Sequence, residues 1–438
     1  MNNFKAGERI LNKLNDAGYS AYFVGGCVRD KMMGKTPSDI DITTAALPDE
    51  VKRLFPHTID TGLKHGTVTV VEEDIPFEIT TYRIESNYEN HRAPKYVEFV
   101  DDIIKDLSRR DFTINAMAYN KKAGLVDPFG GKKDIEGKII RCVGEPLDRF
   151  EEDALRMLRA VRFACQTGFE IEERTLSAIK EKAHLIKFIS EERIFAELKK
   201  ALCGTFPGKL SLCADTGLFD YFLPEFSLCF KMPQNTPYHL YNVGEHILKA
   251  VENVSNNEVA RLSALFHDIG KPFVRTTDEK GIDHFYGHEQ KSAEIADEVL
   301  KRLKCDNKTR EAVCRIIYHH RWTKEVSMKT VKEKILDVKK ENFQNLLYLM
   351  EADTYAHNLD FVENRVEAMK EIRRIYEIIK EEDHPLDISD LKINGNTLMN
   401  MGYSGKEVGK KLGEALKIVI ENPEKNTEEF LIERFLKR

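Results

Sequence analysis

The chain has 438 residues, which at roughly 150 residues per domain predicts two to four domains with enough material for buried cores. Hydrophobic residues make up 42% and charged residues 32% of the sequence, a balance that excludes collagen-like and largely disordered chains. The 67 Lys and Arg are outnumbered by 73 Asp and Glu. The net charge of −6 therefore argues against non-specific coating of nucleic acid or anionic membrane, although local basic grooves remain allowed.

The N-terminal sequence, the hydropathy and the cysteine spacing favour an intracellular protein. The first residues lack a basic stretch followed by a continuous apolar run, so they do not predict a signal peptide. No stretch approaches the roughly 18 to 20 apolar residues of a membrane-spanning helix, and we expect no membrane partner. The eight cysteines contain no Cys-x-x-Cys pair, which disfavours a disulfide framework and a thiolate zinc site. We expect a cytoplasmic location.

Hydrophobic periodicity predicts an α+β domain followed by helical domains. Residues 4–17 show helical spacing before Gly18, and a strand at 21–26 opens a series of short β-like runs that alternate with turns to about residue 130. From about residue 134 apolar residues recur at three- and four-residue spacing. We predict an α+β head at 1–140, a helical neck at 141–238, a second helical domain at 239–380 and a C-terminal tail at 381–438.

The densest chemistry lies in the segment FVGGCVRDKMMGKTPSDIDITT. Gly25 and Gly26 end an apolar strand, and Asp39 and Asp41 are predicted to lie two residues apart on another strand, where a period of two puts both carboxylates on one face. Hard oxygen ligands held this close suit Mg²⁺, and their natural use is two-metal phosphoryl transfer. Taken alone, Asp-x-Asp also fits a solvated strand face, but the ordered motifs that follow favour the functional interpretation.

These motifs resemble the tRNA nucleotidyltransferase and poly(A) polymerase family. The resemblance runs through GGCVRD with DID, FEITTYR, RRDFTINAMAY, DPFGG, EDALRMLRAVRF and ERIFAELKKAL, over residues 20–202. It implies a polymerase-β-like catalytic head in which Asp39 and Asp41 bind Mg²⁺. The resemblance further implies that Gly26 and Arg29 contact the triphosphate, Arg110 contacts the nucleotide, and Asp111 and Asn115 shape the ribose side of the pocket. Asp111 and Asn115 could instead cap the following segment, and Glu78 in FEITTYR is either a third active-site acid or a solvated strand residue.

Four polar residues of EEDALRMLRAVRF fall at three-residue steps and are predicted to form a strip on one helix: Asp153, Arg156, Arg159 and Arg162. An Asp acceptor and an Arg donor complement the edges of cytosine and adenine, which each offer an amino donor beside a ring nitrogen. Uracil would present a second acceptor to Asp153, a mismatch that costs about 1 to 3 kcal/mol. From spacing alone the strip could be a surface salt-bridge helix. The resemblance implies a nucleotide-reading helix, with Arg159 and Arg162 acting on phosphate or holding the network.

The segment at 84–107 is polar and contains proline at first, and we expect a mobile loop beside the active site. In CCA-adding relatives a flexible loop at this position is associated with the final A addition. The loop therefore argues mildly against an enzyme that adds only two C residues, and it does not separate CCA addition from poly(A) synthesis.

Eight of the 13 histidines fall in residues 239–357: His239, His246, His267, His284, His288, His319, His320 and His357. Imidazoles and carboxylates that converge from separate helices are typical of a metal site. The order of these residues resembles the HD phosphohydrolase superfamily, with HDIGK as the most specific piece. The resemblance implies a divalent transition metal held by His246, His267, Asp268 and Asp353. A second metal would use His288 and either His319 or His320, and a degenerate domain that only helps to hold tRNA is the alternative.

The sequence thus predicts a nucleotidyltransferase that adds CCA to tRNA from CTP and ATP, with a phosphohydrolase-like HD domain downstream. The HD substrate could be a 2′,3′-cyclic phosphate or a 3′-phosphate on a damaged tRNA end, by analogy with relatives. Two alternatives remain: a poly(A) polymerase, and an HD phosphohydrolase or RNA-binding protein with an inactive transferase head. Oligomeric state is not readable from the sequence.

Overall fold

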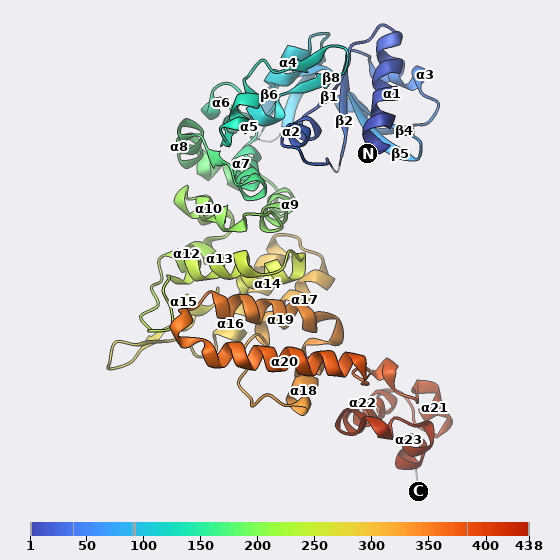
Figure 1. The fold of residues 1–438 in the computed structure, drawn as a ribbon, viewed down its shortest axis with the longest axis vertical. Helices are drawn as coiled ribbons and strands as arrows, with labels where there is room; N and C mark the ends of the chain where they lie inside the picture. The colour runs from blue at the N-terminus through green and yellow to red at the C-terminus, as the bar shows by residue number, and fades with distance from the viewer. Residues whose placement is uncertain (1, 38, 90, 92, 383, 437–438) are drawn as a thin grey trace. The chain divides into compact units, whose positions relative to one another are not determined.

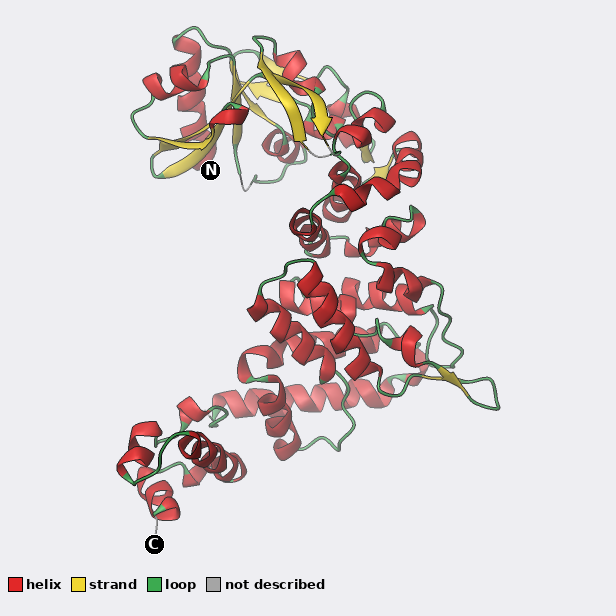
Figure 2. Cartoon of the chain, turned by 180° about the vertical axis from the view of Figure 1, so that it is seen from behind, coloured by secondary structure: helices red, strands yellow, loops and turns green. Residues whose placement is uncertain are grey.

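The computed structural model describes residues 2–37, 39–89, 91, 93–382 and 384–436. The chain divides into two compact units, residues 1–224 and 225–438. The first unit is α+β and the second is almost entirely helical (Figure 2), which confirms the predicted fold class. All eight cysteines lie in the described part and are free. Within the described residues, no helix combines the length and the apolar composition needed to cross a membrane. The predicted boundaries at 140, 238 and 380 stay predictions.

The elements of the first unit are numbered as in Figure 1. The helices are α1 (Asn2–Asp16), α2 (Gly26–Met32), α3 (Pro48–Leu54), α4 (Ile103–Ser108), α5 (Gly131–Glu136), α6 (Pro146–Glu152), α7 (Leu155–Thr167), α8 (Glu173–Lys182), α9 (Glu191–Leu202), α10 (Ser211–Asp215) and α11 (Phe219–Phe222). The strands are β1 (Ala21–Val24), β2 (Asp41–Thr44), β3 (Thr58–Gly62), β4 (Thr67–Glu72), β5 (Ile75–Thr81), β6 (Arg83–Glu89), β7 (Ala93–Phe99), β8 (Ala118–Asn120), β9 (Gly124–Val126), β10 (Ile139–Ile140) and β11 (Glu170–Ile171).

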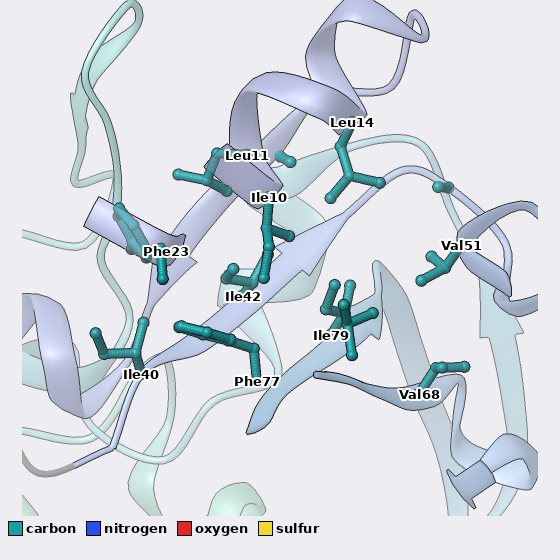
Figure 3. Packing of buried hydrophobic residues seen from close by; sticks show 14 of the residues in the cluster. Ile10, Leu11, Leu14, Phe23, Ile40, Ile42, Val51, Val68, Phe77 and Ile79 are labelled. Atoms are coloured by element: carbon teal, nitrogen blue, oxygen red, sulfur yellow. The ribbon is translucent and has the colours of Figure 1, made fainter. Parts of the chain in front are cut away.

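A mixed sheet forms the centre of the first unit. Among the described residues it has seven strands in the order β3-β4-β5-β2-β1-β8-β9, with β2 parallel to β5 and antiparallel to β1. Helix α1 lies along β1, β2, β4 and β5 (Figure 1), where Ile10 and Leu14 pack onto Phe23, Ile42 and Ile79 (Figure 3). Because side chains alternate along a strand, the side chains of the residues between these apolar ones point to the opposite face of the sheet. That face is free to carry polar chemistry.

The segment at 84–107 is not the predicted loop for most of its length. It contains the antiparallel hairpin of β6 and β7 and then α4. The run YVEFV at 96–100 has the alternation of a strand, and pairing with β6 satisfies its backbone groups. The structure therefore places a two-stranded arm, separate from the main sheet, between β5 and α4.

The second unit is a helical bundle followed by a smaller helical cluster. Its helices are α12 (Pro224–Phe230), α13 (Val243–Asn253), α14 (Glu258–Phe266), α15 (Lys271–Val274), α16 (His288–Arg302), α17 (Asn307–Tyr318), α18 (Met328–Val338), α19 (Lys340–Tyr355), α20 (Glu363–Glu381), α21 (Gly395–Asn400), α22 (Lys406–Glu421) and α23 (Glu428–Phe435), with short strands β12 (Thr276–Thr277) and β13 (Asp283–His284). Helices α13 and α14 pack on each other and on α19. The last three helices have their own apolar core, which includes Leu398, Ala415 and Leu431.

Candidate active sites

Three carboxylates gather where β2 begins. Asp41 is the first residue of β2 and pairs in register with Glu78 of β5, so both side chains leave the face opposite the apolar core. Burial raises the pKa of Asp41; Arg110 opposes this rise, whereas Glu78 and Asp39 add to it. A divalent cation with oxygen ligands would relieve this crowding of negative charge. The acids fit such an ion by their chemistry.

Asp39 lies outside the strand, so the prediction that both aspartates occupy one strand is wrong. Strand β1 ends at Val24, opposite Asp41, and Gly25 then turns the chain into α2. On the other side, the register of β5 would bring Pro76 opposite Asp39, and proline has no N–H for a ladder hydrogen bond. Asp39 nevertheless stays close enough to raise the pKa of Asp41.

The turn into α2 lies beside the cationic side chain of Arg110, which also acts on Asp41. Gly25 has φ +74°, a left-handed conformation that favours glycine, and a Cβ there would lie 3.0 Å from Nη1 of Arg110. Nη2 of Arg110 lies 3.3 Å from Asp106. Nε of Arg110 is buried without a hydrogen-bond partner among the described residues.

A chain of hydrogen bonds joins α2 to α7. Arg29 donates from Nη1 to Oδ1 of Asn115 at 2.7 Å, and Asn115 donates from Nδ2 to Oδ1 of Asp111 at 3.2 Å. Arg159 of α7 donates from Nε to the other Asp111 oxygen at 2.8 Å. Burial opposes ionisation of Asp111, but Arg159 and these hydrogen bonds hold its pKa well below the ordinary value. The structure thus brings together three regions of the sequence, with Arg29 86 residues before Asn115 and Arg159 48 residues after Asp111.

Asp153 and Arg156 do not share the predicted helical strip. Asp153 has an extended backbone between α6 and α7, and its Oδ1 accepts the N–H of Leu155 at 3.1 Å. Asp often accepts such a local hydrogen bond at the start of a helix. Asp153 therefore lies between α6 and α7, whereas the three-residue spacing predicted one continuous helix. The other oxygen, Oδ2, accepts from Nη2 of Arg193 at 2.9 Å. Only the three arginines of the strip lie on α7.

Two of those arginines are buried in internal pairs. Arg156 donates to the carboxylate of Glu152 at 2.7 Å and to the backbone oxygen of Arg109 at 3.0 Å. Arg162 pairs with Glu197 at 3.0 Å, and burial, followed by the nearby Arg159, lowers its pKa to about 10. Arg162 is thus held in the interior of the first unit by its ion pair with Glu197.

The second unit contains a buried cluster of histidines and aspartates. Nε2 of His246 lies 3.0 Å from Asp353 and 3.3 Å from Asp268, and Nε2 of His267 lies 3.4 Å and 3.3 Å from the same two carboxylates. These four side chains place one ligand atom each within 4.8 Å of one another. The predicted set His246, His267, Asp268 and Asp353 is therefore brought together, although its role as a metal site stays a proposal.

Asp268 also faces a second group. Its Oδ1 lies 3.2 Å from Nε2 of His288, and His320 completes this group within 4.8 Å. The carboxylate thus has one oxygen toward each group, the arrangement of a bridging ligand. His320 is 5% exposed and belongs to the cluster, whereas the half-buried His319 belongs to none of the candidate groups among the described residues. The structure selects His320 from the predicted pair.

Backbone carbonyls fix the orientation of the imidazoles. The Nδ1 atoms of the histidines lie within hydrogen-bond distance of the following carbonyls: His246 of Ala356 at 3.2 Å, His267 of Ala264 at 2.8 Å, His288 of Phe285 at 2.7 Å and His320 of Ile317 at 2.6 Å. Because a carbonyl only accepts, each Nδ1 carries a hydrogen, and Nε2 is the ring nitrogen left to serve as a metal ligand. Nε2 of His267 is buried with no hydrogen-bond partner in the described part, which fits a metal ligand.

Two further histidines were not assigned a role by the sequence. His239 and His357 form a third close group with His246, but His246 already uses Nδ1 on a carbonyl and directs Nε2 to the carboxylates. His357 donates from Nδ1 to the Asp353 carbonyl at 2.7 Å, and its Nε2 accepts from Arg365 at 3.1 Å. In the sequence, His357 lies four residues after Asp353, and His239 lies seven residues before His246. This closeness to two of the predicted ligands was the signal that could have identified them.

A cavity of about 550 Å³ opens onto these clusters. Its wall includes the buried Lys271, which lies 2.7 Å from Asp268, together with Arg365 and the aromatic Trp322. Nδ1 of His239 and Nε1 of Trp322 are buried without a hydrogen-bond partner among the described residues, and both side chains line the cavity. A cavity with cations, an aromatic wall and unpaired polar atoms beside a metal-type cluster suits a phosphorylated ligand.

Comparison with protein families finds three ordered matches. Residues 21–141 match the poly A polymerase head domain, residues 168–229 match the probable RNA- and SrmB-binding site of polymerase A, and residues 236–399 match the HD domain. Curated CCA-adding enzymes are 53% identical over 213 residues in Geobacillus kaustophilus and 48% identical over 219 residues in Ligilactobacillus salivarius. These matches cover 48% and 50% of this chain, and they span only 53% and 54% of the relatives.

Solved structures match over more of the chain. The Bacillus stearothermophilus CCA-adding enzyme in complex with CTP is 30% identical, with a TM-score of 0.70, over 99% of this chain and 98% of that one. The Thermotoga maritima CCA-adding enzyme complexed with tRNA is 22% identical, with a TM-score of 0.53, over 97% and 93% of the two chains, and shows likeness of fold alone.

Proposed function

Because the chain belongs to the tRNA nucleotidyltransferase and poly(A) polymerase family, we propose that it adds C, C and A to tRNA 3′ ends from CTP and ATP. The 30% identity over nearly the whole length to a CCA-adding enzyme solved with CTP supports this assignment. The observation that carries the proposal is the gathering of Asp41, Glu78 and Asp39 at the start of β2, beside Arg110. A tRNA substrate accords with a cytoplasmic location.

Asp39 and Asp41, with Glu78 beside them, would hold Mg²⁺ in the head. Bound Mg²⁺ supplies an activated 3′ hydroxyl and charge neutralisation on the triphosphate. Arg29 and Arg110 provide the positive charge for triphosphate oxygens, and Gly26 lets the backbone approach them.

Asp153 and Arg156 would read the incoming base. An Asp acceptor and an Arg donor match the amino group and ring nitrogen that cytosine and adenine share. Uracil would leave Asp153 opposite another acceptor, at a cost of about 1 to 3 kcal/mol. Arg193 already donates to Asp153, and Glu152 accepts from Arg156, so both readers are oriented before the nucleotide arrives.

The second unit would act as a metal-dependent phosphohydrolase. His246, His267, Asp268 and Asp353 would hold one transition-metal ion, and His288 and His320 would hold a second that shares Asp268. Such ions supply a bound water of lowered pKa for attack on a phosphate ester. Lys271, Arg365 and Trp322 on the cavity wall suit the phosphate and base of a nucleotide, such as a 2′,3′-cyclic phosphate or a 3′-phosphate on a tRNA end.

The two-site assignment is tested with a tRNA transcript that lacks CCA. Label from CTP and ATP should enter the transcript with the native chain and with His267→Ala, and Asp41→Asn should stop it. Hydrolysis of a 2′,3′-cyclic nucleotide should show the reverse pattern. Loss of incorporation in His267→Ala would contradict two separate sites.

A further inference from the structure

Aromatic side chains form part of the wall of the cavity in the second unit. Tyr286 follows β13 and Trp322 follows α17, and both residues line the cavity. Tyr286 comes two residues before His288 in the chain. Trp322 comes two residues after His320, the other histidine of the second ligand group. Because two residues of chain span at most about 7 Å, a nucleotide with its phosphate at this group has both rings within reach.

Trp322 presents a half-buried indole to the cavity. Lys334 lies over the ring, with its Nζ 5.7 Å from the ring centroid, and this contact places a positive charge against the π system. An indole in a cavity wall offers a flat apolar surface on which a nucleobase of any type can stack.

Tyr286 is the more exposed of the two aromatic residues. It is 74% exposed and stacks on the ring of His284, with the ring planes 6° apart and the centroids 5.4 Å apart. His284 also lines the cavity, and its Nε2 lies 3.0 Å from Oδ2 of Asp278. The partner ring is therefore held in place while most of the tyrosine stays uncovered. The pair forms a second stacking surface, on the solvent side of the cavity.

The hairpin that carries this pair is anchored at its base. β12 and β13 have two residues each, and the hairpin projects from the helices of the second unit (Figure 2). Oδ1 of the buried Asp283 accepts from Arg275 at 2.9 Å and from the hydroxyl of Thr277 at 2.8 Å. Oδ2 accepts the N–H of Asn235 at 3.0 Å. Since a two-stranded ribbon is barely stable alone, these bonds keep Tyr286 beside the cavity.

Two cations on the same wall suit a sugar–phosphate backbone. Lys271 is buried against Asp268, at the metal-type cluster. Arg365 is exposed on the wall, donates to Nε2 of His357, and has no carboxylate partner in the described part of the chain. A guanidinium without an acidic partner is typical of phosphate recognition. Cations interleaved with aromatic rings are the pattern by which proteins bind single-stranded nucleic acid.

We propose that the cavity of the second unit selects the end of a single-stranded RNA over a free nucleotide: Trp322 stacks on the terminal base, and Tyr286 stacks on the base before it. This inference rests on the phosphohydrolase function proposed above and adds the substrate class to it. The half-buried ring takes the terminal nucleotide because it lies in the cavity wall beside His320. The exposed ring takes the preceding nucleotide because an RNA strand that leaves the cavity must pass its solvent side.

Binding is measured by the fluorescence of Trp322, the only tryptophan in the sequence, so the first unit contributes no signal. The full-length protein is titrated with adenosine and with an RNA trinucleotide, each carrying a 3′-methylenephosphonate, whose carbon–phosphorus bond resists hydrolysis. Both probes should quench the fluorescence, and inorganic phosphate should not. Because a second stacked base adds about tenfold to affinity, the trinucleotide should bind about tenfold more tightly than the mononucleotide.

The same titrations are made with Tyr286→Ala, Tyr286→Phe and Tyr318→Ala. Tyr318 is the matched control, since it is 52% exposed and also lies two residues from His320, but it is not part of the cavity wall. Tyr286→Ala should weaken binding of the trinucleotide about tenfold and leave the mononucleotide unchanged. Tyr286→Phe keeps the ring, so it should bind both probes like the native chain, as should Tyr318→Ala.

Any of four results would overturn the inference: no quenching by the trinucleotide, equal affinity of the native chain for the two probes, an equal loss of both probes in Tyr286→Ala, or the same loss in Tyr318→Ala. The phosphohydrolase function fails separately. In that case the probes bind in the expected pattern, but the Mn²⁺-loaded protein does not hydrolyse the same trinucleotide with a 2′,3′-cyclic phosphate end.

Discussion

At the residue scale, Asp41 concentrates the charge on which the proposed transfer depends. Its carboxylate is crowded by Glu78 and Asp39, and Arg110 offsets part of that crowding. Asp41→Asn removes a proposed metal ligand with almost no change of shape. We expect CTP and ATP incorporation to fall by at least about a hundredfold, in a single-turnover assay with saturating Mg²⁺.

The matched control is Asp60→Asn, since Asp60 lies on β3 of the same sheet and is exposed beside Lys52 at 2.9 Å. This variant should keep native incorporation. An active Asp41→Asn protein would remove Asp41 from the proposed metal site.

Asp111 should contribute to stability as well as to the nucleotide pocket. It is buried and paired with Arg159, and removal of one partner from such a pair costs about 3 kcal/mol or more. The pKa of Asp111 is depressed in the folded state, so its contribution is present above its unfolded pKa of about 3.9 and is lost as pH falls through the folded value. Asp111→Asn should therefore lower the free energy of unfolding by about 3 kcal/mol at pH 7.

Urea unfolding measures this loss, and Glu145→Gln provides the control because Glu145 pairs with Arg174 on the exposed surface. The control should change the free energy of unfolding by less than about 1 kcal/mol. Equal stability of Asp111→Asn and the native chain would show that the α2–α7 network does not hold the fold together.

At the element scale, the second-metal proposal depends on where α17 ends. His319 and His320 follow this helix directly, and only His320 turns into the cluster with Asp268 and His288. We predict that the native chain binds two transition-metal ions in the second unit and that His320→Ala binds one. His319→Ala, the neighbouring control, should bind two.

Metal content after dialysis against Mn²⁺, measured by atomic emission, gives both numbers. A His320→Ala protein that still binds two ions would eliminate the second group, and the same loss in His319→Ala would show that the effect is not local.

Periodicity predicted the elements well and their ends poorly. The apolar spacing at residues 4–17 predicted a helix where the structure has α1, and the apolar run at 21–26 predicted a strand where it has β1. Asp39 was predicted to lie on the strand that begins at Asp41, and Asp153 on the helix that begins at Leu155, but both residues precede these elements. A spacing of two or three residues does not indicate where a strand or a helix begins. Pro76 of β5 ends the ladder before Asp39, and the carboxylate of Asp153 itself starts α7. Both corrections depend on contacts that only the folded chain supplies.

The histidine cluster shows the same limit. The resemblance to the HD phosphohydrolase superfamily implied that His246, His267, Asp268 and Asp353 lie together, and the structure brings these four residues together. The choice between adjacent histidines was not implied, since it depends on the helical phase at the last turn of α17. The hydrogen bond between His91 and the backbone oxygen of Glu151 could not be predicted either, because it joins residues 60 apart in the sequence.

At the scale of the whole molecule, each compact unit has its own core and its own cluster of chemical groups. The family matches follow this division, with the poly A polymerase head at 21–141 and the HD domain at 236–399. Such an arrangement predicts two activities that variants can separate. It does not by itself decide how many nucleotides the first unit adds.

The most direct test is therefore the length of the product. Purified protein with Mg²⁺ is incubated with tRNA transcripts that end before CCA, after C and after CC, with CTP and ATP supplied separately and together, and the products are resolved on a sequencing gel. We predict growth by three, two and one nucleotides, followed by a stop. A long ladder from ATP alone would contradict CCA addition and indicate a poly(A) polymerase, and hydrolysis without any growth would indicate that the head is inactive.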